Sequence, residues 1–376
     1  MKKFNLLQIV PSLDSGGVEQ GTIDLANYLA KLEYNNLIVS NGGKLTTCLN
    51  NKFVKHLKLP VHSKNFLKQP FVAKKINSLI HDNNINILHI RSRAPAWLLP
   101  YIDKSNLKTV STFHNVYGHQ NIIKKIYNQG LSKTNYIVAI SKYVEETIIK
   151  KYKIDPKKIR VINRGVDIDF FNSKINNESE FIKFLESKNI TDNKKIILIP
   201  GRLTKWKGQL EFLEIIEKLK DNPYIFYFVG DDKNSSYKNK LLKQINKKKL
   251  NNLIKFFGHL NQNELKMIYN CADIVISCPL KEEGFGRTIS ESLLMKKIIL
   301  AYNFGGAKNQ LTGLDDIYKI TPHAQSELIN RIQTILNSSS ENYNNLKEIS
   351  RLHIVNNFSK QHMLDQYLNL YKEISN

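Results

Sequence analysis

The sequence is short of cysteine and of acidic residues, and it contains no long hydrophobic run. Three cysteines in 376 residues, with no Cys-x-x-Cys pair, argue against a disulfide framework and against a zinc site. This cysteine usage suits a reducing cytoplasm. No apolar stretch approaches the roughly 20 residues that a membrane-spanning helix needs. The N-terminus also lacks a long apolar segment with a small-residue cleavage site, so we expect a first β-strand there and a cytoplasmic protein.

The shortage of acidic residues gives the chain a strong positive charge. It has 56 lysines and arginines against 33 aspartates and glutamates, a formal net charge of +23. This excess predicts an anionic partner, which could be nucleic acid, an anionic membrane surface or a phosphorylated substrate. A general bias of the sequence toward Lys, Asn and Ile explains much of the excess equally well. No helix-turn-helix or RNA-binding signature is visible, so we expect no nucleic-acid partner.

Short apolar runs alternate with longer amphipathic segments in two successive series. The runs are Phe4–Val10, Asn36–Ser40, Ile87–Ile90, Thr109–Thr112, Tyr136–Ile140, Arg160–Ile162, Lys195–Ile199, Tyr224–Val229, Ile254–Phe257, Ile274–Cys278, Ile298–Tyr302 and Ile317–Ile320. Such strands are typical of parallel sheets covered on both faces. The predicted fold class is therefore α/β, with two doubly wound domains. The polar segment 172–195 separates the series, so we expect domains over residues 1–175 and 190–357, followed by an amphipathic helix that begins at Ser359.

One loop in the second half has the composition of a phosphate site. The predicted strand ends at Ile199, and Arg202, Lys205 and Lys207 cluster before a helix that we expect to begin near Gly208. Positive side chains beside a helix N-terminus attract anions, because free N–H groups and the helix dipole add to their charge. Open α/β sheets bind ligands beyond their strand C-termini. We therefore prefer phosphate binding to the alternative of an ordinary basic loop.

A second loop has the same strand–glycine–helix pattern and is flanked by two carboxylates. Its turn consists of Gly284, Phe285 and Gly286. Glycines there allow backbone N–H groups to approach a phosphate closely. Glu283 precedes the turn and Glu291 follows it; eight helical residues would span about 12 Å, the reach from a ribose across a diphosphate to a sugar. A carboxylate such as Glu291 can accept two hydrogen bonds from a vicinal diol. Favourable helix-dipole contacts are the alternative, and they leave the glycines unexplained.

The first half contains a glycine loop and a histidine at predicted strand ends. Gly16 and Gly17 follow the first strand but do not form the Gly-x-Gly-x-x-Gly fingerprint of dinucleotide sites. The loop is therefore either a tight turn or a ligand-facing segment. His114 comes immediately after a predicted strand, and it is either a structural histidine or a ligand contact.

Two further polar pairs in the first half carry alternative interpretations. Arg91 and Arg93 lie close to Trp97 after a predicted strand, where they could bind an anionic acceptor group or form a surface loop. Asp167 and Asp169 could hold Mg²⁺ with a diphosphate. We favour a turn at the close of the first domain for this second pair.

Two lysine-rich segments of the first half also contain large apolar residues. Residues 64–76 and 121–133 mix lysine with Phe, Leu and Ile. This composition suits peripheral binding to anionic lipid, on the inner face of the cytoplasmic membrane. Ordinary amphipathic helices with a lysine-rich outer face are the alternative.

The combined motifs resemble glycosyltransferase family 4, the group 1 glycosyltransferases of GT-B fold. GRLTKWKG followed by EGFGRTISE carries the resemblance, and PSLDSGGVEQ, VAISKYVEE and INRGVD extend it over nearly the whole chain. Glu283 and Glu291 match the family's E-x7-E signature, Arg202 and Lys207 its diphosphate-binding pair, and His114 its strand-end histidine. RSRAPAW and GRLTKWKGQ are similar to a bacterial subgroup that makes lipopolysaccharide and other surface glycans. Arg164, in INRGVD, replaces the asparagine that is commoner in the family.

The resemblance implies a fold and a reaction. Two Rossmann-like domains would face each other across a cleft, and the C-terminal helix 358–376 would cross back to the N-terminal, acceptor-binding domain. A sugar would move with retention of configuration from a UDP- or GDP-sugar to a glycan or lipid-linked acceptor, in lipopolysaccharide or other cell-surface polysaccharide biosynthesis, without an obligatory metal or cofactor. The alternatives are a nucleotide-sugar epimerase or phosphorylase of the same architecture and, more distantly, a basic nucleic-acid-binding protein.

The resemblance also implies roles for the residues of both loops. Arg202, Lys207 and the turn 284–286 would stabilise the charge that develops on the departing diphosphate. Glu291 would bind the ribose and Glu283 would position the donor sugar. The resemblance further implies that His114, Gly16 and Gly17 complete the site from the other domain.

Overall fold

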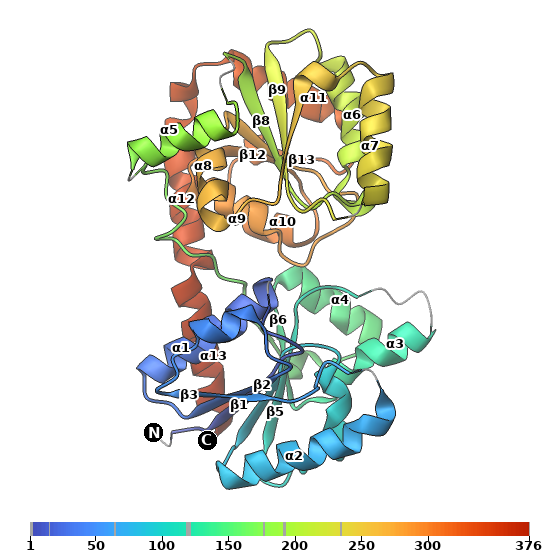
Figure 1. Ribbon diagram of the computed structural model, residues 1–376, viewed down its shortest axis with the longest axis vertical. Coiled ribbons are helices and arrows are strands. Elements are labelled where there is room, and N and C mark those ends of the chain that lie inside the picture. Colours follow the sequence, from blue (N-terminus) through green and yellow to red (C-terminus); the bar gives the residue numbers. More distant parts are fainter. Residues whose placement is uncertain are drawn as a thin grey trace. The chain divides into compact units, whose positions relative to one another are not determined.

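The computed structural model describes residues 3–14, 16–63, 65–117, 122–175, 177–190, 193–233 and 235–375. The chain forms two compact units: the first unit is Met1–Gly165 with Gln361–Asn376, and the second is Val166–Lys360 (Figure 1). The first segment therefore ends at Gly165, whereas the sequence pattern suggested 175. The physical reason is that Val166 already pairs with the end of the second unit: its N–H donates to the Phe358 carbonyl (2.9 Å), and its carbonyl accepts from the Lys360 N–H (2.8 Å).

The first unit is built on a parallel sheet with the strand order β3-β2-β1-β4-β5-β6-β7. Its strands are β1 (Leu6–Ile9), β2 (Asn36–Ser40), β3 (Val54–Lys58), β4 (Ile87–Ile90), β5 (Lys108–Phe113), β6 (Tyr136–Ala139) and β7 (Ile159–Val161). Its α-helices are α1 (Gly17–Lys31), α2 (Gln69–Asp82), α3 (Ile122–Gln129), α4 (Lys142–Tyr152) and, from its second residue on, α13 (Lys360–Ser375). Short 3-10 helices are η1 (Lys44–Cys48), η2 (Phe66–Lys68), η3 (Pro95–Tyr101), η4 (Gly130–Lys133) and η5 (Pro156–Lys158).

The predicted strands of this unit are present, and β3 is an addition. β3 was not predicted because it lies at the edge of the sheet and has only two apolar residues, Val54 and Leu57, among lysines and a histidine. The predicted last helix begins at Lys360, directly after Ser359. Its apolar face packs within the first unit, beside α1 and the sheet (Figure 1). The shared core contains Phe4, Leu6, Leu25, Leu29, Ile87, Val110, Val138, Ile162, Met363, Leu364, Tyr367, Leu368, Leu370, Tyr371 and Ile374.

The second unit is built on another parallel sheet, with the strand order β10-β9-β8-β11-β12-β13. Its strands are β8 (Lys195–Pro200), β9 (Tyr224–Val229), β10 (Ile254–Gly258), β11 (Ile274–Ser277), β12 (Ile298–Tyr302) and β13 (Lys319–Ile320). Its α-helices are α5 (Glu178–Ser187), α6 (Gln209–Lys218), α7 (Ser235–Lys247), α8 (Gln262–Cys271), α9 (Arg287–Leu294), α10 (Gly305–Leu311), α11 (Gln325–Asn337) and α12 (Asn344–Phe358). The 3-10 helices are η6 (Lys205–Lys207), η7 (Asn251–Leu253), η8 (Asp316–Tyr318) and η9 (Ser340–Tyr343).

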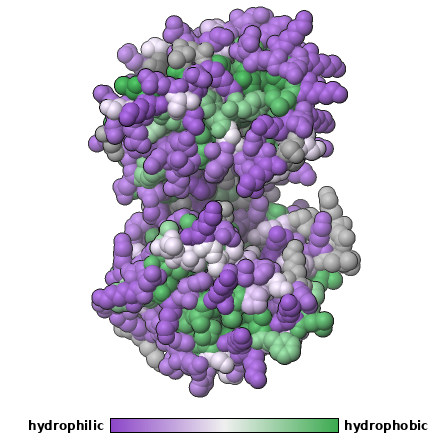
Figure 2. Space-filling view, viewed as in Figure 1, coloured by the Kyte–Doolittle hydropathy of each residue, from purple (hydrophilic) through white to green (hydrophobic). Residues whose placement is uncertain are grey.

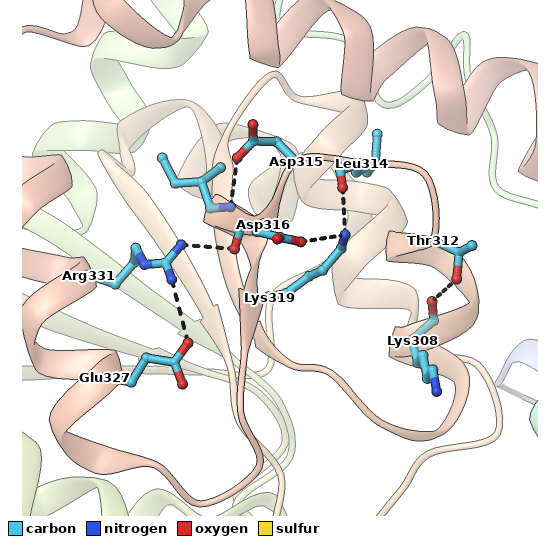
Figure 3. A network of polar contacts seen from close by, with 9 residues as sticks. Lys308, Thr312, Leu314, Asp315, Asp316, Lys319, Glu327 and Arg331 are labelled. Carbon is cyan, nitrogen blue, oxygen red and sulfur yellow. Dashed lines mark hydrogen bonds and ion pairs between the residues drawn. The ribbon is translucent and has the colours of Figure 1, made fainter.

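The last strand of this sheet begins two residues later than predicted. A polar network holds η8 in place of the first part of that strand (Figure 3). The Asp315 side chain accepts from the Ile317 N–H (2.8 Å), and the Lys319 amine donates to the Leu314 carbonyl (2.6 Å). Arg331 on α11 donates to the Asp316 carbonyl (2.8 Å). The network thus satisfies the backbone groups of Leu314, Asp316 and Ile317 outside the sheet.

In both sheets the strand order reverses direction at one position. The reversal lies between β1 and β4 in the first unit and between β8 and β11 in the second. Carboxyl ends of parallel strands meet at one edge, and ligands of open α/β sheets bind where the order reverses. None of the described helices has the length and apolarity needed to cross a bilayer.

Candidate active site

The loop after β8 is shaped by a close approach to the loop after β11. Lys205–Lys207 form η6, and Gly208 then adopts a left-handed conformation (φ 79°) before α6. A Cβ on Gly208 would lie 3.0 Å from the Cys278 carbonyl oxygen. The Leu280 N–H donates to the Trp206 carbonyl (2.8 Å). Glycine at 208 therefore lets the two loops pack together at the strand-order reversal.

Lys207 and Glu283 form an ion pair across these two loops. Their side chains are only 16% and 15% exposed, so solvent screens the pair weakly. The Lys207 amine also lies 4.8 Å from the centre of the Trp206 ring. Arg202 follows Gly201 at the same sheet edge, and its side chain is exposed. The structure thus joins two of the predicted site residues directly and leaves Arg202 as a nearby exposed cation.

The glycine turn after β11 is held in a defined shape by the start of α10. Gly286 is the N-cap of α9, with a left-handed backbone (φ 86°). The Gly306 N–H donates to the Glu283 carbonyl (2.8 Å), and a Cβ on Gly306 would lie 2.5 Å from the Phe285 Cα. The Gln310 side chain donates to the Phe285 carbonyl (2.5 Å). The turn is therefore preformed, with its carbonyls turned toward α10.

A ligand at this turn would meet the backbone of Phe285 and not its ring. The ring is buried, 5.9 Å from that of Phe358.

Gly306 and Gln310 were not among the residues that the sequence pattern selected. The run FGGAKNQ after β12 repeats the strand–glycine–helix pattern of the other two loops, and this signal could have identified them.

Glu291 is buried in α9 with a partner for each carboxylate oxygen. It is 5% exposed, and Arg287, one turn earlier, lies 2.7 Å from its Oε1. The Tyr269 hydroxyl on α8 donates to its Oε2 (3.2 Å). Burial, followed by the charge of Glu291, raises the pKa of Tyr269 well above its usual value, so the tyrosine is a neutral donor. A carboxylate offers about four acceptor positions, so Glu291 retains capacity for a diol. Tyr269 carries no local motif and was missed.

In the first unit, Arg164 lies close to the predicted glycine loop, and the charges of Arg164 and Arg91 act on His114. Gly17 begins α1, and a Cβ there would lie 2.6 Å from a terminal nitrogen of Arg164. Among the described residues, no hydrogen bond of normal geometry reaches the buried ring nitrogens of His114. The Arg91 backbone carbonyl partly favours the protonated ring. Burial above all, and then Arg164 and Arg91, lower the pKa of His114 well below its ordinary value. His114 is therefore a neutral imidazole at neutral pH, able to donate one hydrogen bond and accept another.

The two arginines after β4 have different environments. Arg91 is 2% exposed, so the surface-loop alternative does not apply to it. Arg93 donates to the Asn128 side chain (3.0 Å) and lies 4.0 Å from the centre of the Tyr117 ring. Arg93 therefore connects the segment after β4 to α3 and to the loop that contains Tyr117.

Asp167 begins a turn, as predicted, but this turn belongs to the start of the second unit and not to the close of the first domain. Its carboxylate accepts from the Phe170 N–H (3.0 Å) and pairs with Lys360 at 2.5 Å. Within the described ranges, no group of three or more His, Cys, Asp or Glu side chains could hold a metal ion.

Comparison with known proteins identifies the family. The sequence model of Glycosyltransferase Family 4 matches residues 15–170, and that of Glycosyl transferases group 1 matches residues 180–353. A glycosyltransferase from Rickettsia africae ESF-5, of known crystal structure, is 36% identical; the match covers 100% of this chain and 99% of that one, with a TM-score of 0.89.

Two more distant structures share the fold. HepE from Anabaena, solved in complex with UDP-glucose, is 18% identical with a TM-score of 0.81, over 98% of this chain and 99% of that one. WaaG, a glycosyltransferase involved in lipopolysaccharide biosynthesis, is 14% identical with a TM-score of 0.71, over 97% and 99% of the two chains. The predicted α/β class and GT-B fold are confirmed, and this chain belongs to glycosyltransferase family 4, the group 1 glycosyltransferases.

Proposed function

We propose that this glycosyltransferase moves a sugar, with retention of configuration, from a UDP- or GDP-sugar to a glycan or lipid-linked acceptor of cell-surface polysaccharide synthesis. The observation that carries the donor assignment is the Lys207–Glu283 ion pair beside the preformed turn 284–286, at the strand-order reversal. The complex of HepE with UDP-glucose supports a uridine donor, and the part of WaaG in lipopolysaccharide biosynthesis supports a surface glycan.

The donor is held along its length by groups of the second unit. An ammonium has three donors, so Lys207 can bind a phosphate oxygen while it keeps Glu283. Arg202 adds a second cation, and the N–H groups of the turn 284–286 face the diphosphate. Glu283 accepts hydrogen bonds from the sugar hydroxyls, and Glu291 binds the ribose diol in an orientation set by Tyr269.

The reaction needs charge stabilisation more than a protein base. The bond between the sugar carbon and the diphosphate oxygen breaks, and the acceptor oxygen forms its bond on the same face. The acceptor hydroxyl gives its proton to the departing phosphate oxygen. Lys207 and Arg202 stabilise the negative charge on that phosphate, and preformed loops do so with little reorganisation. In the first unit, neutral His114 and the loop of Gly16 and Gly17 offer hydrogen-bonding groups to a ligand.

Thermal shifts with nucleotide sugars test the donor assignment, because a ligand of the native state raises the melting temperature. We expect UDP-glucose or another nucleotide sugar to stabilise the protein, and Lys207→Ala and Glu291→Ala to weaken that effect. Unchanged donor affinity in both variants would contradict the proposal. Donor turnover without any acceptor would favour the epimerase alternative.

We also propose that the first unit binds an anionic membrane through the segment 66–75, here called the α2 patch. Phe66, Leu67 and Phe71 are 56%, 82% and 75% exposed, and Lys74 and its neighbour Lys75 are also exposed. Figure 2 shows hydrophobic side chains gathered where Figure 1 places α2. Exposed apolar side chains beside lysines suit an anionic lipid surface.

Trp97 extends this patch to the second lysine-rich segment. Its ring lies 5.3 Å from that of Phe66 and 6.0 Å from that of Tyr127 on α3. Ile126, beside Tyr127, is also exposed. The first residue of the segment 121–133 lies outside the described residues. Through Tyr127, the described part of this segment lies beside the α2 patch.

Sedimentation with anionic vesicles tests the patch. We expect binding at low salt that Leu67→Asp together with Phe71→Asp abolishes. Leu352→Asp is a matched control, because Leu352 is also exposed (57%) but lies on α12 of the second unit. Equal binding by the patch variant and the control, or no binding by the wild type, would contradict the proposal.

A further inference from the structure

Arg91 is a buried cation whose hydrogen-bonding groups are not satisfied. It directly follows β4 at the strand-order reversal of the first sheet, and its backbone N–H donates to the Ile9 carbonyl on β1 (2.9 Å). The residue is 2% exposed, yet among the described residues neither Nε nor Nη1 of its guanidinium has a hydrogen-bond partner. Arginine is almost never fully buried without a partner, and buried donors are usually satisfied. The unmet donors therefore point to a ligand.

The surroundings of Arg91 include other groups that favour an anion. A Cβ on Gly21 would lie 3.5 Å from Nη2 of Arg91, and a Cβ on Gly17 would lie 2.6 Å from Nη2 of Arg164. Arg164 therefore approaches the first residue of α1, and Arg91 approaches the fifth, at the start of the second turn. This fifteen-residue helix has no side-chain hydrogen bond at its N-cap, Gly16. A helix N-terminus and two arginines together attract a negative group strongly.

The single carboxylate in the first turn of α1 lies on the side of Gly16. Oε2 of Glu19 is 2.6 Å from the position that a Cβ on Gly16 would occupy. The unmet nitrogens of Arg91 have no hydrogen bond to it. Within the described ranges, Glu19 therefore leaves Nε and Nη1 of Arg91 without a carboxylate partner.

Arg91 packs against Tyr367, which belongs to a buried cluster of hydrogen-bonded polar side chains around His89. Its guanidinium carbon lies 5.3 Å from the centre of the Tyr367 ring on α13. His89 accepts or donates on both ring nitrogens, to the Tyr371 hydroxyl (2.6 Å) and to the Thr112 hydroxyl (2.7 Å). These groups are neutral, so they position Arg91 without neutralising it. Helix α13 therefore helps to position the guanidinium of Arg91, because it supplies Tyr367 to the first unit.

We infer that Arg91, Arg164 and the first turn of α1 form a subsite for a phosphate group of the acceptor. The inference rests on the proposed glycosyl transfer, because it names a chemical feature of the acceptor. A bidentate guanidinium contact suits phosphate, and the first unit is where the resemblance puts the acceptor. The phosphate belongs either to a phosphate-linked lipid or to a phosphorylated glycan.

Inorganic phosphate is the probe, measured by calorimetry on the full chain in an Arg202→Ala/Lys207→Ala background. That background removes the two cations of the proposed donor site, so any phosphate binding that remains belongs elsewhere. We expect measurable binding that Arg91→Met weakens by about tenfold or more, as loss of a charge-assisted hydrogen bond predicts. Absence of binding in the background variant, or equal affinity after Arg91→Met, would overturn the inference.

A control arginine and a stability measurement separate binding from folding. An unpaired buried charge is unfavourable, so Arg91→Met should keep or raise the melting temperature. Arg93→Met should instead lower it, because Arg93 is bonded to Asn128 and stacked on Tyr117, and it should keep phosphate affinity. A lower melting temperature for Arg91→Met with unchanged phosphate affinity would assign Arg91 a structural role. If Arg91→Met does not fold, Arg91→Gln provides the same comparison.

Two further binding experiments distinguish this subsite from the donor site and identify the source of the phosphate. UDP binding to the Arg91→Met single variant should equal that of the wild type; a tenfold loss would assign Arg91 to the donor diphosphate and overturn the inference. Failure of the wild type to bind any nucleotide sugar would instead contradict the proposed function alone. Vesicles that contain a phosphate-linked polyprenol should compete with inorganic phosphate if the acceptor is lipid-linked, whereas competition by a soluble sugar phosphate alone indicates a glycan.

Discussion

Replacing Glu283 by glutamine should have opposite effects on the binding of free nucleotide and on sugar transfer. The Lys207–Glu283 pair is about five-sixths buried. Removing one partner of a fully buried pair costs about 3–5 kcal/mol. Allowing for the partial exposure, we expect Glu283→Gln to lower the free energy of unfolding by about 2–3 kcal/mol, because Lys207 then lacks its counter-charge.

A bound diphosphate would supply that missing counter-charge. If it recovers about half of the lost free energy, UDP should bind about tenfold more tightly to Glu283→Gln than to the wild type. Transfer should fall sharply in the same variant, because no carboxylate orients the donor sugar. Lys207→Ala should weaken UDP about 10- to 100-fold, the value of one charge-assisted hydrogen bond.

Titration calorimetry with UDP, urea unfolding and initial rates with UDP-sugar provide the three measurements. Lys205→Ala is the matched control: it lies in the same short helix η6 but is exposed, and its UDP affinity should change less than about threefold. If Glu283→Gln weakens UDP binding as strongly as Lys207→Ala does, both residues of the ion pair are needed to bind phosphate. The assignment of Lys207 to the phosphate and of Glu283 to the sugar would then be wrong.

Three other predictions concern the surroundings of the site. Tyr269→Phe leaves an oxygen of buried Glu291 without its donor, so urea unfolding should show a loss of about 1–3 kcal/mol, and UDP should bind more weakly. Gly306→Ala forces the Phe285 backbone to move, and donor affinity should fall at least about tenfold by calorimetry; normal affinity would mean that the turn is not preformed. Burial first, and then nearby arginines, lower the pKa of His89 and His114, so only the unfolded chain takes up their protons near pH 6.5. Stability should therefore fall as pH drops below about 6.5, by up to about 1.4 kcal/mol per pH unit for each histidine. Urea unfolding between pH 5.5 and 7.5 checks this, and a flat profile would contradict it.

The strands of both sheets could be predicted wherever both faces are covered. β2, β4, β9 and β12 match the predicted ranges at both ends, because a parallel strand buried on both faces is a continuous apolar run. β3 could not be recognised, because an edge strand keeps polar side chains. The late start of β13 depends on Arg331 and Lys319, whose partners lie in other elements or beyond a turn.

The sequence by itself determined the class of the protein and the short motifs at its strand ends. Arg202, Lys207, Glu283 and Glu291 could be selected because each motif is local. Only the tertiary structure decided which side chains meet. Lys207 pairs with Glu283 across 76 positions, and Tyr269 donates to Glu291 across 22. The burial of Arg91 and the clamping of the turn by α10 depend on strands and helices that are distant in sequence. Charge pairing, desolvation and steric clearance are properties of such packed neighbours, and spacing along one chain does not encode them directly.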